Sequence, residues 1–172
     1  MLSFSSAPDF DNPTDTGGNN VYDVIVQVSD GSLTDTQAIS VTVTAVNDNT
    51  PVITSNGGGA TASVNVAENT TSVTTVTATD ADLPAQTLTY SIVGGADQAL
   101  FTINASTGAL SFTSGRDRES ATDADADGIY EVTVQVSDGS LADTQAISVT
   151  VTAVNDNTPT ITSNGGGPTA SV

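Results

Sequence analysis

The sequence predicts an all-β protein, a Greek-key β-sandwich with about seven strands in each repeating unit. Three observations support this fold class. Apolar and polar residues alternate at a period of two, β-branched residues dominate the apolar set, and the sequence repeats itself at an offset of 108 residues. A period of this length is too long for a solenoid unit and fits one sandwich domain per repeat.

The clearest alternation lies in residues 130–136 and 146–152, where every second residue is apolar. Asp138-Gly139 lies between these runs and is a hairpin turn signal. No helical periodicity competes with this pattern, and the β-branched content favours strands. Further strands are expected near 52–53 and 63–66 and over 73–78, 88–93, 101–104 and 109–112.

The internal repeat sets the expected domain organisation. Residues 21–64 and 129–172 are identical at 38 of 44 positions. We therefore expect 1–47 to be the C-terminal part of one repeat, 48–156 a complete repeat, and 157–172 the start of the next. Each partial unit is too short to bury a core alone.

The charge balance restricts the partners and the chemistry. The 172 residues include 20 acidic and two basic ones, a net charge of −18, with no histidine and no cysteine. Such a chain repels nucleic acid and anionic lipid, and it suits a cationic partner. Without histidine, cysteine or lysine it cannot form a Ser-His or Cys-His pair, so we expect no enzyme. We also expect no membrane span in this segment, because no apolar run is long enough.

Acidic and amide residues gather at the ends of the expected strands. The motif Asn-Asp-Asn follows the last strand of each unit, and the other acids form short Asp-x-Asp or Asp-x-Glu groups or stand singly. As candidate metal ligands we take Asp9, Asp11, Asn47, Asp48, Asn49, Glu68, Asp80, Asp82, Asp117, Glu119, Asp138, Asn155, Asp156 and Asn157. Their hard oxygen donors suit Ca²⁺, and the chain offers no soft ligand for zinc or copper.

These residues resemble the calcium-binding signatures of cadherins, in the cadherin order. Glu68 stands before Asn, 80–82 form a D-x-D motif, 117–119 read D-R-E, Asp138 lies in an A-x-D-x-G-like motif, and 155–159 read N-D-N-x-P. The resemblance implies a cadherin/immunoglobulin-like sandwich, an extracellular or cell-surface location, and tandem repeats with calcium-bridged junctions. Near-identical tandem units are most similar to the cadherin-like repeats of large bacterial surface adhesins.

The resemblance also implies which residues share ions. The junction at 47–49 would collect Asp9 and Asp11 from the unit before it, and 80–82 and Asp138 from the unit after it. Of these, the site nearest the following unit is expected to be complete. The second junction keeps Glu68 and the acids of 117–119 and 155–157, so the site nearest the preceding unit is expected to remain there.

The function implied by the resemblance is a calcium-rigidified spacer in an extracellular adhesin or filament that supports cell adhesion. Its partners would be neighbouring repeats of the same chain or head-to-tail copies. Two alternatives stay open: the repeat itself makes homophilic or surface-glycan contacts, or the chain is a self-assembling filament subunit.

One acidic motif falls outside the cadherin pattern. Asp123, Asp125 and Asp127 precede Gly128 and resemble the start of an EF-hand-like loop, but the twelfth position is Val134 and not glutamate. Two interpretations are open, an acidic connecting loop and an additional cation site.

Overall fold

The computed structural model describes residues 1–163, which contain eleven β-strands and two short 3₁₀-helices. In chain order they are β1 (Val21–Ser29), β2 (Thr34–Thr42), β3 (Val52–Ile53), η1 (Ser55–Gly57), β4 (Thr61–Ala67), β5 (Ser72–Thr75), β6 (Ala78–Thr79), β7 (Thr89–Gly94), η2 (Gln98–Leu100), β8 (Phe101–Ile103), β9 (Ala109–Phe112), β10 (Ile129–Ser137) and β11 (Ala142–Thr152). The predicted all-β fold class is confirmed.

Strands β3 to β11 form a sandwich. One sheet has the order β4-β11-β10-β7, the other the order β5-β9-β8, and β3 and β6 form a separate short pair. β4 runs parallel to β11, and every other pairing in these sheets is antiparallel. The chain passes from one sheet to the other between β4 and β5, and again between β7 and β8, as a Greek-key sandwich requires.

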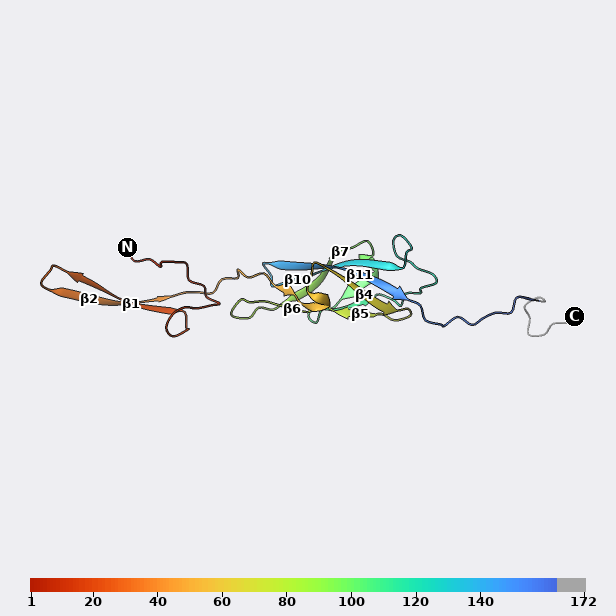
Figure 1. Ribbon diagram of the computed structural model, residues 1–172, viewed down its shortest axis with the longest axis horizontal. Helices are drawn as coiled ribbons and strands as arrows, with labels where there is room; N and C mark the ends of the chain where they lie inside the picture. The colour runs from red at the N-terminus through yellow and green to blue at the C-terminus, as the bar shows by residue number, and fades with distance from the viewer. Residues whose placement is uncertain (164–172) are drawn as a thin grey trace.

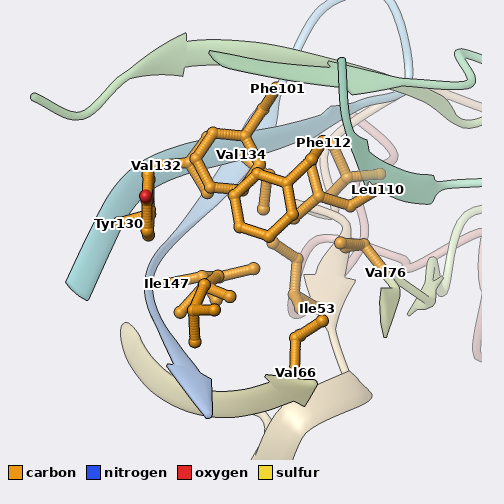
Figure 2. Packing of buried hydrophobic residues seen from close by; sticks show 13 residues of the cluster. Ile53, Val66, Val76, Phe101, Leu110, Phe112, Tyr130, Val132, Val134 and Ile147 are labelled. Carbon is orange, nitrogen blue, oxygen red and sulfur yellow. The ribbon is translucent and has the colours of Figure 1, made fainter. Parts of the chain in front are cut away.

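The core lies between the two sheets and is made of inward-facing side chains (Figure 2). Phe112 of β9 is its aromatic centre, with ring centroids 4.6 Å from Phe101 and 5.2 Å from Tyr130. The period-two alternation accounts for this packing, because one face of each strand is apolar. The buried apolar residues are Ile53, Val66, Val76, Phe101, Leu110, Phe112, Tyr130, Val132, Val134, Val136, Ile147, Val149 and Val151.

The expected strand over 73–78 is wrong in one respect, because the structure divides it into β5 and β6. β5 pairs with β9, whereas β6 pairs with β3. Between them Val76 is fully buried, and its N–H donates to the carbonyl of Gly108 at 2.9 Å. The sandwich therefore has nine strand segments, one more than the eight runs expected from the sequence, because the chain changes sheets where the sequence pattern reads as one run.

β1 and β2 form a separate two-stranded hairpin that pairs from Val21–Thr42 to Ser29–Thr34. None of the buried apolar residues of the core cluster comes from this hairpin. The hairpin lies at one end of an elongated molecule, the sandwich lies in the middle, and the chain leaves the sandwich at the opposite end (Figure 1). In the described part of the chain, no helix has the length and apolar character needed to span a bilayer.

Candidate metal sites at the two ends of the sandwich

The segment between the hairpin and the sandwich is held by one buried carboxylate. Asp82 follows β6 and is only 2% exposed. Its Oδ1 accepts a hydrogen bond from the N–H of Asp48 at 3.4 Å. The same oxygen accepts two more from Asn49, at 3.1 Å from its N–H and at 2.8 Å from its side-chain amide. The carboxylate therefore fixes the linker against the first end of the sandwich.

Asp11 reaches the same place from the partial unit. Its Oδ2 accepts a hydrogen bond from the Asn49 amide at 3.0 Å, and its Oδ1 accepts one from the N–H of Leu83 at 2.7 Å. Asp11, Asp48 and Asp82 each place one carboxylate oxygen within 4.8 Å of the others. We name this set the linker cluster; it combines an acid that precedes β1, an acid of the segment between the hairpin and the sandwich, and an acid of the sandwich.

A second set, the entry cluster, contains Asp80, Asp82 and Asp138, whose oxygens also lie within 4.8 Å of one another. Asp80 Oδ1 accepts a hydrogen bond from the N–H of Asp82 at 3.0 Å, but Asp80 Oδ2 is buried and has no partner. A buried acceptor without a donor costs free energy. A cation at this position would satisfy that oxygen.

Asn47 extends the entry cluster. Its amide nitrogen donates to Gln86 Oε1 at 2.8 Å, which leaves its amide oxygen 3.2 Å from a carboxylate oxygen of Asp82 and of Asp138. Three acceptors facing one another are stabilised by a cation between them. Reversing the amide would instead let Asn47 donate to both carboxylates, so Asn47 contacts the cluster in either orientation.

At the opposite end of the sandwich, Glu68, Glu119 and Asp156 form the exit cluster, again with oxygens within 4.8 Å. Glu68 directly follows β4 and is 2% exposed. Its two oxygens accept hydrogen bonds from the N–H groups of Val154 and Arg118. Glu68 therefore ties the D-R-E loop to the segment that leaves β11.

Two members of the exit cluster have pKa values shifted in opposite directions. Hydrogen bonds from the N–H of Val154, and then from that of Arg118, lower the pKa of Glu68 below its ordinary value. Burial, followed by the negative charge of Glu68, raises the pKa of Glu119. Without a cation the second carboxylate resists ionisation, which is the expected behaviour of carboxylates that share a site.

Six predicted ligands are not members of these three clusters. Asn47 and Asn49 contact the clusters through their amides, as described above, and the other four lie outside them. Asp9 Oδ1 accepts a hydrogen bond from the N–H of Asp11 at 2.9 Å, and Asp117 Oδ1 accepts one from the N–H of Glu119 at 2.9 Å. Both aspartates thus order a loop that carries a cluster member. Asn157 donates to Asp156 at 3.1 Å, and Asn155 is exposed.

Two residues that were not predicted support the clusters. Gln86 donates to Asp82 Oδ2 at 3.3 Å, and Asn69 donates to Asp156 Oδ2. Asn69 could have been inferred from its place after Glu68. No signal in the sequence marks Gln86, because its approach depends on the fold of the loop after β6.

The donor set fits a hard divalent cation. The three clusters consist of carboxylate and amide oxygens, and the chain has no histidine or cysteine that would favour a softer metal. Of the two arginines, Arg116 is buried over the Phe112 ring at 5.3 Å and donates to Thr113 Oγ1 at 3.0 Å. Its charge is therefore engaged in packing. Acidic groups that could hold a metal lie at both ends of the sandwich.

The fold and these clusters define the class of protein: a β-sandwich of mainly antiparallel strands whose acids gather at its two ends. The chain belongs to the cadherin family, because the cadherin domain model matches residues 62–154, more than half of its length. The predicted resemblance to cadherins is confirmed. Cadherin domains are extracellular modules of adhesion proteins.

Three comparisons place the chain within this family. It is 37% identical over 131 residues to human Protocadherin Fat 1, an alignment that covers 74% of this chain and 3% of that protein. The solved structure of Protocadherin Gamma B2 extracellular cadherin domains 3–6 matches with a TM-score of 0.64 and 25% identity, covering 87% of this chain and 37% of that chain. The Protocadherin gammaB7 EC3–6 cis-dimer structure gives a TM-score of 0.64 and 25% identity, covering 88% of this chain and 37% of that chain.

The chain thus spans only a small part of the curated relative and about a third of each solved chain. The relatives are adhesion proteins and not enzymes. That this chain lacks catalytic activity and does not bind nucleic acid stays a prediction.

Proposed function

We propose that this chain is a calcium-rigidified spacer of an extracellular adhesion protein, in which Ca²⁺ ions bridge successive sandwich units. The observation that supports this most directly is the linker cluster, because Asp11, Asp48 and Asp82 come from the first unit, the linker and the complete repeat and still meet within 4.8 Å. Cadherin domains bind calcium, and the predicted ligand types are those that calcium prefers.

The proposed mechanism is electrostatic. Without a cation, the carboxylates of the linker and entry clusters repel one another and drive the hairpin unit away from the sandwich. Asp82 belongs to both clusters, so Ca²⁺ bound at one of them is coupled to Ca²⁺ bound at the other. The flexible linker then becomes a stiff connection, and the exit cluster does the same for the unit that follows.

The expected energy is large enough to decide whether a joint is ordered. Extracellular calcium modules have dissociation constants on the order of 10⁻⁴–10⁻³ M. Free calcium at about 100 times the dissociation constant stabilises the bound form by roughly 2.7 kcal/mol per site. Two such sites at one joint would together supply roughly 5.4 kcal/mol, which matches the backbone entropy cost of ordering about three to five residues.

We propose the domain boundaries stated above, with 48–156 as one complete repeat between two partial ones. The position of the core supports them, because the buried apolar residues all lie between Ile53 and Val151. Residues 157–163 continue the chain beyond β11, and the remainder of the third unit, residues 164–172, lies outside the described residues.

We further propose that the parent protein is a long, repetitive surface adhesin of the bacterial kind, or a filament built from such repeats. The near-identity of the two copies, 38 of 44 positions, supports a spacer, because a spacer needs length more than individual pockets. The second candidate function is homophilic adhesion by the repeat itself. It is supported by the solved cadherin relative described as a cis-dimer.

Calcium titration calorimetry of the whole chain tests the proposal, with Asp82→Asn as the decisive variant. Asparagine keeps an acceptor for the linker N–H groups but removes the charge shared by two clusters. We expect this variant to lose calcium binding at the first joint and to keep it at the exit cluster. Asp35→Asn, a matched charge change on an exposed residue of β2, is the control and is expected to bind calcium like the parent.

Melting in chelator shows whether the Asp82→Asn variant keeps its fold, since a folded variant should still unfold in one cooperative transition without calcium. A parent chain that binds no calcium, or a folded variant that binds as many ions as tightly as the parent, would contradict the proposed function.

A further inference from the structure

The loop between β9 and β10 carries a fourth acidic cluster that shares no member with the three above. Asp123, Asp125 and Asp127 each place a carboxylate oxygen within 4.8 Å of the others. This is the motif that sequence analysis left open between an acidic connecting loop and an additional cation site. It lies outside the set of residues proposed to form the joints.

Asp123 is the buried member of this cluster, with 7% of its surface exposed. Its Oδ2 accepts hydrogen bonds from the N–H of Asp127 at 2.7 Å and of Gly128 at 3.2 Å. Its Oδ1 is also buried and has no hydrogen-bond partner in the structure. A carboxylate oxygen in this state is costly unless it is satisfied by a further group, and the neighbouring side chains are themselves acids.

Two more carboxylates surround the loop. Asp97, 4% exposed, accepts hydrogen bonds from the N–H of Ala124 at 2.7 Å and of Glu131 at 2.8 Å, and so fixes the loop against the end of β7. Burial raises the pKa of Glu131, and the charges of Asp125, Asp97, Asp127 and Asp123 raise it further. The Arg118 guanidinium packs against Gly128, the residue that follows Asp127.

The partial unit contains a matched copy of the loop without two of these acids. The offset of 108 places Asp15 at the position of Asp123, Gly17 at that of Asp125 and Asn19 at that of Asp127. Asp15 still accepts hydrogen bonds at 3.0 Å from the N–H groups of Gly17, Asn19 and Asn20. The loop therefore orders its backbone around the first aspartate alone.

The two loops have a left-handed residue at the same position. Gly18 has a φ of 59° and the equivalent Ala126 has a φ of 62°, in the left-handed region that alanine rarely adopts. The carboxylates of Asp125 and Asp127 are thus not needed to form this turn. They add mutual repulsion, since the charge of Asp127 is the main cause of the raised pKa of Asp125.

We propose that Asp123, Asp125 and Asp127 bind a hard divalent cation of the Ca²⁺ class. The spacing Asp-x-Asp-x-Asp-Gly is that of the first half of a known type of calcium loop. Val134, at the twelfth position, is fully buried in β10 and cannot supply the closing carboxylate.

The structure offers its own control variant. The double substitution Asp125→Gly/Asp127→Asn gives the loop the residues that its first copy has at these positions, so the backbone is expected to be retained. Calcium titration of the whole chain, followed through backbone amide resonances, reports each site separately. In the parent we expect the amides of 123–131 to shift with calcium and one ion to be bound there. In the double variant we expect those shifts to be absent and the bound calcium to fall by one equivalent.

The Asp82→Asn variant separates this inference from the proposed function, because it removes joint ligands and should leave the calcium shifts of 123–131 intact. If the glycine-containing variant fails to fold, Asp125→Asn/Asp127→Asn removes the same charges without changing backbone freedom. Loop resonances that do not move while calcium saturates the joint clusters would overturn the inference. Full calcium stoichiometry in a folded double variant would overturn it as well.

Discussion

The hairpins β1–β2 and β10–β11 are two copies of nearly the same sequence in two different environments. The two hairpins have the same register, offset by 108 residues. β1–β2 pairs from Val21–Thr42 to Ser29–Thr34, and β10–β11 pairs from Ile129–Thr150 to Ser137–Ala142. Their burial nevertheless differs. Val136 is fully buried in the core, whereas its equivalent Val28 is 68% exposed.

What the two hairpins share is local. In each turn an aspartate accepts hydrogen bonds from the N–H groups two and three residues later, Asp30 in one and Asp138 in the other. In each unit a tyrosine hydroxyl accepts a hydrogen bond from a preceding loop, at 3.3 Å for Tyr22 and 3.2 Å for Tyr130. Strand pairing and turn chemistry therefore specify the hairpin, but only the opposing sheet buries its apolar face.

The largest expected effect is on the free energy of unfolding, and it should differ between two equivalent valines that are each replaced by alanine in a separate variant. Val136→Ala should destabilise the sandwich by about 2 kcal/mol, because it removes buried methyl groups and leaves a cavity. Val28→Ala should change the stability of the sandwich by less than about 0.5 kcal/mol, since its side chain is largely in solvent. Denaturant unfolding in calcium measures both. Equal losses would show that the first hairpin is packed in a core of its own.

A smaller effect should separate the two turns by charge. Asp138→Asn keeps the acceptor of the turn and removes a carboxylate from the entry cluster, so calcium affinity at that cluster should fall about tenfold, or about 1.4 kcal/mol. Asp30→Asn makes the same change in a turn that belongs to none of the clusters identified here, and calcium affinity should stay as in the parent. Calorimetry compares them. A loss of affinity in the Asp30 variant, or none in the Asp138 variant, would contradict the placement of the entry cluster.

The smallest expected effect is the pH dependence of the exit cluster without calcium. In the folded protein the pKa of Glu119 is raised above the ordinary value of 4.5. As pH rises past 4.5, the unfolded chain releases this proton before the folded protein does. The free energy of unfolding therefore falls until the pH passes the folded-state pKa. The lowered pKa of Glu68 acts in the opposite sense: its stabilisation is present above 4.5 and is lost as pH falls through the folded-state pKa.

Glu119→Gln isolates the first of these contributions. In chelator, the decline in stability above pH 4.5 should be smaller in the variant than in the parent, since one titrating group is gone while Glu131 keeps its raised pKa. Melting temperatures over a pH series compare it with the parent, and calcium affinity at the exit cluster should fall in the same variant. An unchanged pH profile would show that Glu119 does not titrate against Glu68.

The sequence predicted most of the fold because the determinants of the strands are local. The alternation around Tyr130 and the Asp138-Gly139 turn specify β10–β11 without knowledge of the rest of the chain. The break at Val76 was missed, because the sheet change depends on Gly108, a residue of another hairpin. Fully buried Gln145 was missed for the same reason: its amide donates to the carbonyl of Gly59 across the sandwich at 2.8 Å.

The members of the candidate sites could be predicted where they belong to motifs that occur in the same order as in cadherins. Asp82 and Asp138 lie far apart in the sequence, and only the resemblance to cadherins indicated that they meet. The role of Asp97 had no such signal, because it bonds to the N–H groups of Ala124 and Glu131 in a loop that has no counterpart in the cadherin motifs. Contacts between distant loops depend on tertiary structure, which local patterns do not specify.

The central claim, that carboxylates of successive units share calcium across the joint, is tested most directly by a distance measurement between the units. The chain has no cysteine, so Ser32→Cys at the tip of the first hairpin and Ser106→Cys in an exposed turn of the sandwich accept one spin label each. In calcium we predict a narrow distribution of label-to-label distances by pulsed electron paramagnetic resonance, and in chelator a broad one. The same distribution in both conditions, in a chain that stays folded, would contradict the account.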